Sequence, residues 1–191
     1  MAFFSSYLIP ALWVAWLAGW WLAARNTKQT ARRESLGSRL SYTVPLGIGV
    51  WLLISRRIPW PALNARFVPL ATWPYVVGVA LVVVGLAFAT WARVYLGRNW
   101  SASVTLKRDH ELVRSGPYRW VRNPIYTGMF GMLLATGLAI SHWIGLLIAV
   151  IVFAIGTLVR VRSEERLLRE AFGEEFVAYA GRVPAVVPFF F

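Results

Sequence analysis

The sequence predicts an all-α, polytopic integral membrane protein with about five transmembrane helices and a C-terminal amphipathic helix on the cytoplasmic side. Hydrophobic residues make up 58% of the 191 positions, and the mean hydropathy is +0.57. Both values exceed what soluble domains of this size show. Long apolar runs also alternate with arginine-rich loops, which is the pattern of a chain that crosses a bilayer repeatedly.

Five apolar runs are the candidate spans, because about 20 helical residues are needed to cross a hydrocarbon core of about 30 Å. They extend from Phe3 to Ala24, Tyr42 to Ser55, Phe67 to Ala92, Ile125 to Ile140 and Trp143 to Val159. The second run contains Pro45 and the fourth directly follows Pro124, so their ends are less sharply marked than those of the other three. The first run has no basic residue before it, which disfavours a secretory signal peptide.

The basic residues set the orientation. Alternate loops hold 17 and 3 of the 20 lysines and arginines, so the positive-inside rule places the N-terminus outside and the C-terminus in the cytoplasm. The preference for arginine suggests a bacterial source and therefore the bacterial inner membrane. The net charge of +12 is accordingly a topology signal. We expect no nucleic-acid partner, since no basic stretch belongs to a separate soluble domain.

Composition also excludes several kinds of site. The chain has no cysteine, which rules out disulfides and thiolate chemistry. His110 and His142 are the only histidines, so we expect no metal centre. Without a repeat or linker, we expect a single domain over 1–191. Its parts are three N-terminal spans (1–96), a cytoplasmic segment (97–124), a helical hairpin (125–160) and a C-terminal cytoplasmic segment (161–191).

Two polar clusters flank the predicted hairpin, one at 110–126 and one at 160–165. The short turn at Ser141 and His142 makes the last two spans antiparallel, which brings Tyr126 beside Arg160 at the cytoplasmic face. Pro124 suits the first turn of a helix, whose free N–H groups could hold an anion. Charged groups near a bilayer are costly, so these clusters are the candidate site.

The order of the polar residues resembles the isoprenylcysteine carboxyl methyltransferase family, which is related to the membrane phospholipid N-methyltransferases. The resemblance covers the C-terminal half and rests on His110, Leu112, Val113, Gly116, Tyr118, Arg122, Asn123, Pro124, Tyr126, Glu164, Glu165, Phe172, Gly173, Phe176, Tyr179, Val183 and Pro184. One departure is Asn123, where the family usually has histidine. Asparagine still donates and accepts hydrogen bonds, but it cannot act as a titrating base.

The resemblance implies S-adenosylmethionine as the methyl donor, bound outside any Rossmann domain. The implied cofactor residues are His110, Glu111, Leu112, Val113, Tyr118, Asn123, Pro124, Ile125, Tyr126 and Glu164. A carboxylate such as Glu164 suits a ribose diol, and the apolar Leu112 and Val113 suit adenine. Arg160 and Glu164 are the implied catalytic residues, with Arg160 also binding the substrate through a two-point contact to a carboxylate.

The methyl acceptor is expected to be a lipophilic small molecule or a lipid-modified substrate reached from the membrane lipids. A carboxylate needs no base before attack, which favours carboxyl methylation over the alternative of phospholipid N-methylation. A sterol-reductase-like oxidoreductase using NADPH is a further alternative. A transporter is disfavoured because no charge lies within the spans. A scaffold is disfavoured because the polar residues gather on one face, and the oligomeric state is not predicted.

The same residues also have purely structural interpretations. His110 could lie in a surface loop, and Glu164 and Glu165 could pair with the preceding arginines. Tyr118, Trp120 and Tyr126 could be interfacial aromatics. Leu168, Phe172, Phe176 and Tyr179 fall on one face of a helix, which alone predicts an amphipathic helix on the membrane.

Overall fold

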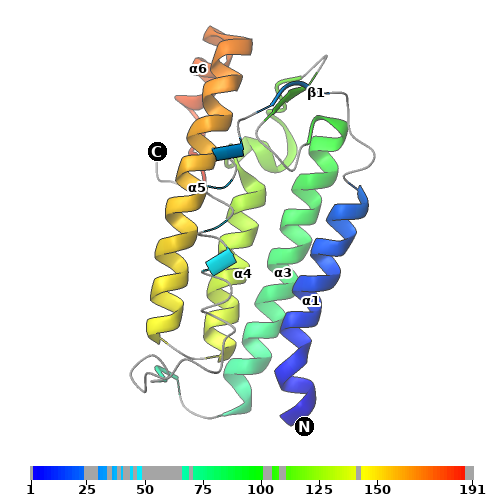
Figure 1. Ribbon diagram of the computed structural model, residues 1–191, viewed down its shortest axis with the longest axis vertical. Coiled ribbons are helices and arrows are strands. Elements are labelled where there is room, and N and C mark those ends of the chain that lie inside the picture. The colour runs from blue at the N-terminus through cyan, green and yellow to red at the C-terminus, as the bar shows by residue number, and fades with distance from the viewer. Residues whose placement is uncertain are drawn as a thin grey trace.

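A bundle of nearly parallel helices forms the body of the molecule in the computed structural model (Figure 1). The structure describes residues 2–23, 30–33, 36–37, 40, 44, 47–48, 66–68, 71–100, 105–107, 111–140 and 143–187. The long helices are α1 (Ala2–Ala23), α3 (Thr72–Leu96), α4 (Pro124–Ile140) and α5 (Trp143–Phe172). They match the first, third, fourth and fifth predicted spans. The second, Tyr42 to Ser55, lies almost wholly outside the described residues.

Two of these helices pass a length and composition test for crossing a bilayer. Within the described residues they are Thr72–Asn99 and Trp143–Phe172, while Tyr7–Ala23 and Pro124–Ile140 are shorter apolar helices. The outer face of α3 carries exposed apolar side chains, among them Trp73, Leu81 and Val84. Side chains of this kind exposed along a helix suit a hydrocarbon environment.

Small residues let α3 and α4 pack closely. A Cβ atom on Gly85 would lie 2.6 Å from the Met132 side chain, and one on Gly128 would lie 2.8 Å from the Cβ of Ala89. Such contacts are too short for any residue larger than glycine. Small residues at helix crossings are typical of membrane bundles, where close van der Waals packing drives association. The α3–α4 pair is therefore the rigid centre to which the site is attached.

Tryptophan side chains fasten α1 to this centre. The indole Nε1 of Trp13 donates to Thr136 Oγ1 at 3.2 Å, and that of Trp16 donates to Thr90 Oγ1 at 3.0 Å. Beside these bonds, Ile9 of α1 packs with Val82 and Ala135 in a buried cluster. Hydrogen bonds between helices within the bilayer contribute on average about 0.6 kcal/mol each, so the packing supplies much of the attachment.

The last long helix differs from the prediction. The expected end of the fifth span, Val159, is interior to α5, which continues without a break to Phe172. Gly173 then adopts a positive φ of 51° and separates α5 from α6 (Glu174–Ala180). The prediction of one amphipathic helix with Leu168, Phe172, Phe176 and Tyr179 on one face is therefore wrong: Leu168 and Phe172 belong to α5, and Phe176 and Tyr179 to the separate helix α6. At 1.5 Å per residue, α5 is about 45 Å long and outreaches the hydrocarbon core.

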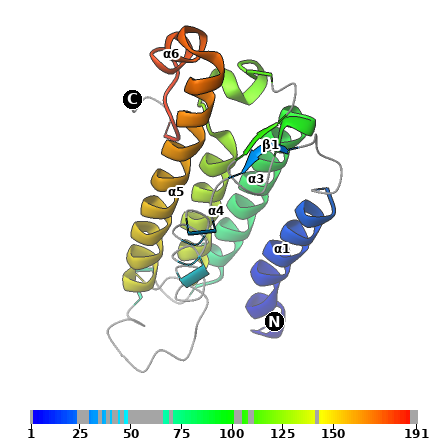
Figure 2. The same ribbon diagram turned by 45° about the horizontal axis from the view of Figure 1, so that its top comes forward.

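A small antiparallel sheet is the main departure from an all-α fold. Strand β1 (Thr30–Arg33) pairs with β2 (Thr105–Lys107), with Thr30 opposite Lys107 and Arg33 opposite Thr105. The sheet lies at the end of the bundle where α1 and α3 finish and where α6 is found, as both ribbon views show (Figure 2). It ties the segment after α1 to the segment that precedes the candidate site.

Candidate functional site

Three side chains meet where α4 begins and where α5 leaves the bundle. The hydroxyl of Tyr126 donates to the Glu164 carboxylate and lies 3.2 Å from each of its oxygens. Arg160 Nε donates to Glu164 Oε1 at 3.0 Å, and the guanidinium carbon lies 5.7 Å from the centre of the Tyr126 ring. We call these three residues the Glu164 cluster. The predicted approach of Tyr126 to Arg160 across the hairpin is confirmed.

The helical spacing explains part of this cluster. Arg160 and Glu164 are one turn apart on α5, where side chains four residues apart are neighbours. Tyr126 belongs to the first turn of α4 and comes from the facing helix. The Glu164 side chain is 26% exposed, so its carboxylate can accept a further donor from a ligand. The cluster thus presents a carboxylate, a guanidinium and a phenol at one point.

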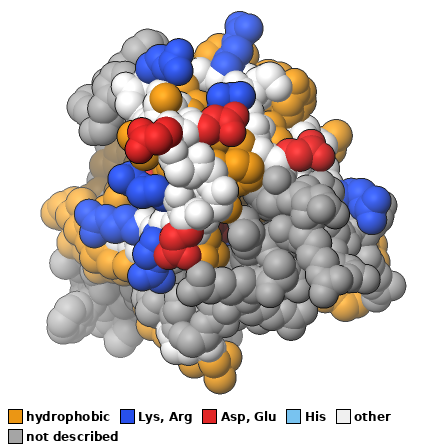
Figure 3. All heavy atoms as spheres, turned by 90° about the horizontal axis from the view of Figure 1, so that it is seen from above, with side chains coloured by type: hydrophobic (Ala, Val, Ile, Leu, Met, Phe, Trp, Pro, Cys, Tyr) orange, Lys and Arg blue, Asp and Glu red, His pale blue; other side chains and the backbone are white. Residues whose placement is uncertain are grey.

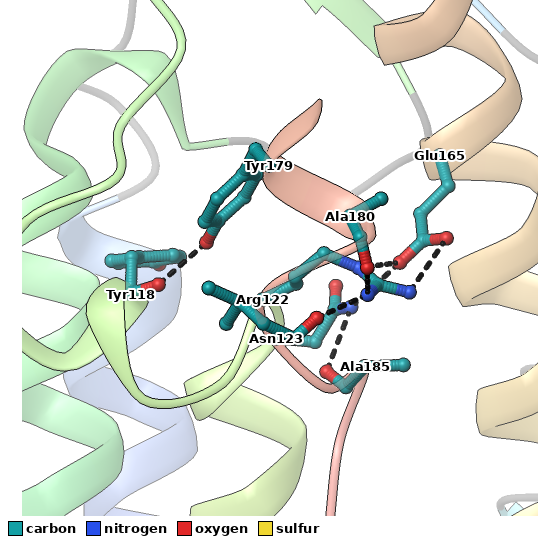
Figure 4. A network of polar contacts seen from close by, with 8 residues as sticks. Tyr118, Arg122, Asn123, Glu165, Tyr179, Ala180 and Ala185 are labelled. Atoms are coloured by element: carbon teal, nitrogen blue, oxygen red, sulfur yellow. Dashed lines mark hydrogen bonds and ion pairs between the residues drawn. The ribbon is translucent and has the colours of Figure 1, made fainter. Parts of the chain in front are cut away.

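A second group of contacts is centred on Glu165 (Figure 4). Arg122 donates to both of its carboxylate oxygens, from Nε at 2.8 Å and from Nη2 at 3.3 Å. Arg122 Nη1 also donates to the carbonyls of Ala180, at 2.8 Å, and of Val183. Asn123 Nδ2 donates to the Glu165 carboxylate at 3.4 Å. We call Arg122, Asn123 and Glu165 the Glu165 cluster.

The chain after α6 runs along the start of α4. The amide of Arg122 donates to the carbonyl of Pro184, and both the amide and the Nδ2 of Asn123 donate to the carbonyl of Ala185, all within 3.1 Å. The hydroxyl of Thr127 donates to the carbonyl of Val186. The backbone amide of Asn123, directly before the helix whose free N–H groups were expected to hold an anion, is therefore engaged by the chain itself.

Two buried tyrosines fix the loop before α4. Tyr118 lies in a 3-10 turn, η3 (Gly116–Arg119), and its hydroxyl donates to the carbonyl of Ala92 on α3 at 3.3 Å. Tyr179 of α6 donates to the carbonyl of Tyr118 at 2.6 Å (Figure 4). Burial, with a smaller effect of the nearby Glu164, raises the pKa of Tyr118 well above its usual range. Burial likewise raises the pKa of Tyr179 to about 12. Both hydroxyls therefore stay protonated near neutral pH.

The other predicted cofactor residues have mixed positions. His110 lies outside the described residues. Glu111 is exposed, and Leu112 and Val113 are partly covered in the irregular segment before η3. Pro124 is buried as the first residue of α4, as predicted, and Ile125 is partly buried. Four of the predicted cofactor residues make side-chain hydrogen bonds at this end of the bundle: Tyr118, Asn123, Tyr126 and Glu164.

Charged side chains gather on the face that covers these clusters, with basic and acidic groups close together and apolar groups at the edges (Figure 3). One exposed pair there joins Arg114 to Glu175 at 2.9 Å, with each side chain about half exposed. The Arg122–Glu165 pair is far less exposed, at 12% and 18%. Arg122 and Glu165 both stand inside the family motifs, but the sequence suggested for Glu165 a pairing with the preceding arginines and not with Arg122. Their mutual contact spans 43 positions, and helical spacing does not predict such a contact.

Comparison with known proteins gives a family for this arrangement. The chain matches the phospholipid methyltransferase family over residues 73–175. It is 34% identical to the protein-S-isoprenylcysteine O-methyltransferase of Saccharomyces cerevisiae over 116 residues, which are 60% of this chain and 48% of that protein. It is also 34% identical to the human protein-S-isoprenylcysteine O-methyltransferase over 158 residues, covering 81% of this chain and 53% of the human one. The chain thus spans about half the length of these curated relatives.

A solved structure supports the same conclusion for the fold. The eukaryotic intramembrane Ras methyltransferase, an isoprenylcysteine carboxyl methyltransferase, superposes with a TM-score of 0.59 at 24% identity, over 80% of this chain and 51% of that one. These matches and the apolar helices identify a membrane protein. The chain therefore belongs to the phospholipid methyltransferase family, and the resemblance to the isoprenylcysteine carboxyl methyltransferase family that its motifs indicated is confirmed.

Proposed function

We propose that this chain is an integral membrane methyltransferase that uses S-adenosylmethionine to methylate a carboxylate on a lipophilic substrate. The Glu164 cluster carries the proposal, because it places a carboxylate, a guanidinium and a phenol together at the mouth of an apolar hairpin. The family relationship supports methyl transfer as the reaction, and the names of the relatives support an oxygen acceptor.

The residues of the cluster fit the methyl donor. S-adenosylmethionine, when bound, supplies a methyl group that its positively charged sulfur releases to a nucleophile. Glu164 can accept hydrogen bonds from a ribose diol or an ammonium group, since its carboxylate is partly exposed. Tyr126 keeps this carboxylate oriented by donating to it. Tyr118, Asn123, Pro124 and Ile125 would border the donor, with His110, Glu111, Leu112 and Val113 as further proposed contacts.

Arg160 would hold the methyl acceptor. Its planar guanidinium can make two parallel hydrogen bonds to a carboxylate, which fixes the direction of the attacking oxygen. An ionised carboxylate needs no proton acceptor, so neither a histidine nor another base is required at this point. The chain's contribution is then alignment and the exclusion of water by the surrounding apolar helices.

A phospholipid amine is the second candidate acceptor, and the match to the phospholipid methyltransferase family favours it. An ammonium group must lose a proton before it can attack. The candidate acceptors for that proton are Glu164, Glu165 and His110, and the two carboxylates already accept hydrogen bonds from Arg160 and Arg122. A carboxylate acceptor therefore remains the better fit to the described residues.

Labelled methyl groups distinguish these possibilities. Membranes that contain the protein would be incubated with methyl-labelled S-adenosylmethionine and either a synthetic S-prenylated cysteine or phosphatidylethanolamine. We expect label that mild alkali releases as methanol, since an ester hydrolyses whereas an N-methyl group does not. Alkali-stable label in the phospholipid would instead support amine methylation. Calorimetry with S-adenosylhomocysteine against NADPH tests the donor: binding of NADPH alone would overturn the proposal.

We also propose the topology given by the charge pattern: five spans in a single domain of the bacterial inner membrane, with the N-terminus outside. Because the chain has no cysteine, single thiols can be introduced without background. Ser163→Cys and Ser38→Cys should react only from the cytoplasm and Ser141→Cys only from outside. Labelling at position 163 from the exterior would reverse the orientation.

A further inference from the structure

The segment that follows α6 is held far more tightly than a surface loop requires. We call residues 180–186, which comprise the last residue of α6 and the segment after it, the strap. Its carbonyls accept hydrogen bonds from the Arg122 side chain (Ala180 and Val183), the Arg122 amide (Pro184), the Asn123 amide and Nδ2 (Ala185) and the Thr127 hydroxyl (Val186). Every one of these donors lies between positions 122 and 127. The strap is therefore attached to one short piece of chain, the start of α4.

Arg122 and Glu165 are the centre of this attachment (Figure 4). Arg122 uses Nε and Nη2 for the Glu165 carboxylate and Nη1 for the two strap carbonyls. One guanidinium, two residues before the start of α4, thus contacts both α5 and the strap. Because the pair is mostly buried, loss of one partner leaves a charge that water cannot fully solvate. The exposed Arg114–Glu175 pair lacks this property.

The residues that hold the strap, Asn123 and Glu165, also hold the two segments that carry Tyr126 and Glu164. The carbonyl of Asn123 accepts the amide of Tyr126 at 3.0 Å, so the turn that holds the strap also sets the position of Tyr126. Glu164 and Glu165 are adjacent on α5, so a helix held through Glu165 is also held at Glu164. A shift at either support would change the distance between the Tyr126 hydroxyl and the Glu164 carboxylate.

We propose that Arg122 and Glu165 are positioning residues that lock the strap across the first turn of α4 and thereby hold Tyr126 and Glu164 in the arrangement that binds the methyl donor. The proposal rests on the proposed function for the identity of the bound ligand. It adds that donor binding and closure of the strap are one coupled equilibrium. Each must then favour the other to the same extent.

A single thiol on the strap reports its closure. In Val186→Cys, the introduced thiol replaces the partly buried side chain of Val186, and the backbone carbonyl of this residue accepts a hydrogen bond from the Thr127 hydroxyl. The purified full chain in detergent would be treated with a thiol reagent, and the labelling rate compared between this parent and the parent carrying Glu165→Gln. We expect labelling at least about tenfold faster with Glu165→Gln, which corresponds to 1.4 kcal/mol less favourable closure.

The same variants then report donor binding. Glu165→Gln should weaken S-adenosylhomocysteine binding about tenfold in calorimetry, and saturating S-adenosylhomocysteine should slow thiol labelling in the parent. Glu165→Asp should recover part of both effects. Thr127→Val keeps the size of the side chain but removes one hydrogen bond to the strap. It should change the labelling rate and the affinity in the same direction as Glu165→Gln, but by less. Glu175→Gln is the matched control, because it removes an exposed ion pair of α6, and it should change neither.

The outcomes separate the strap from the proposed function. An unchanged labelling rate with Glu165→Gln and Thr127→Val would overturn the lock, and this measurement needs no donor. Faster labelling with unchanged S-adenosylhomocysteine affinity would show a purely structural strap and overturn the positioning role. A parent that does not bind S-adenosylhomocysteine would overturn the proposed function and, with it, the coupling to donor binding.

Discussion

Glu164 and Glu165 are neighbours in sequence, yet they belong to two different regions of the molecule. Adjacent residues on a helix point about 100° apart, so each carboxylate meets a different set of partners. Glu164 faces Tyr126 and Arg160 and keeps 26% of its side chain exposed. Glu165 faces Arg122 and Asn123 and is 18% exposed. One carboxylate can still take a ligand, whereas the other is enclosed by its own chain.

Two adjacent carboxylates can therefore have different roles: Glu164 is available to a ligand, and Glu165 holds parts of the fold together. In the Glu164 cluster, the arginine lies one turn away on the same helix, so helix formation alone brings Arg160 and Glu164 together. In the Glu165 cluster, the arginine comes from another segment and reaches backbone carbonyls as well. The first arrangement suits chemistry on a ligand, and the second suits holding the fold in place.

The largest expected effect is on turnover, at Arg160. Arg160→Ala should lower methyl transfer on the order of 100- to 1000-fold, since truncating a charged hydrogen-bonding partner costs about 2–5 kcal/mol. S-adenosylhomocysteine affinity should fall far less than turnover in calorimetry, because Arg160 is proposed to hold the acceptor and touches the donor site only through its hydrogen bond to Glu164. Arg160→Lys should recover only part of the activity. Arg169→Ala, on the exposed surface of the same helix, is the control, and full turnover with Arg160→Ala would remove Arg160 from the site.

The second effect is on stability and compares the two carboxylates directly. Glu165→Ala leaves the mostly buried Arg122 without its carboxylate, which should cost about 3 kcal/mol, since two carbonyl acceptors are still present. Glu164→Ala should cost less, since its side chain is more exposed and Arg160 can turn toward water. Thermal unfolding in detergent should therefore show a lower midpoint for Glu165→Ala. Equal midpoints would contradict the division between the two clusters.

A smaller effect is expected at the Tyr126 hydroxyl. Tyr126→Phe keeps the ring but removes the donor that lies 3.2 Å from both Glu164 oxygens. The loss of one hydrogen bond to a charged group should weaken S-adenosylhomocysteine binding by about 1.5 kcal/mol, close to tenfold. The unfolding midpoint should hardly move. If affinity is unchanged in both Tyr126→Phe and Glu164→Ala, the proposed donor site is elsewhere.

The smallest effect is expected for Asn123→His, which introduces the residue that the family usually carries. A histidine ring nitrogen can replace the Nδ2 donor to Ala185 or to Glu165, but not both at once. Calorimetry should therefore find S-adenosylhomocysteine affinity within about tenfold, or 1.4 kcal/mol, of the parent. Complete loss of binding would mean that the strap contacts require asparagine.

Local rules account for much of what the sequence predicted. Apolar runs of sufficient length identified α1, α3, α4 and α5, since a bilayer demands helices whose backbone groups are satisfied internally. Pro124 gave the start of α4, because proline fits a first turn. The spacing of Arg160 and Glu164 gave their contact in the same way. The motif residues pointed to the family that the comparisons then confirmed.

The remaining features depend on where distant segments meet, which no local pattern contains. The sequence did not show that α5 would run without a break from Trp143 to Phe172, or that β1 and β2 would pair. The choice of partner for each carboxylate was equally hidden, since a turn of about 100° on one helix and a contact across 43 positions decide it. The sequence by itself determined four long apolar helices and the residues near the site. Only tertiary packing decided that Glu164 meets Tyr126 and Arg160 while Glu165 holds Arg122, because burial selects among partners that the sequence merely makes available.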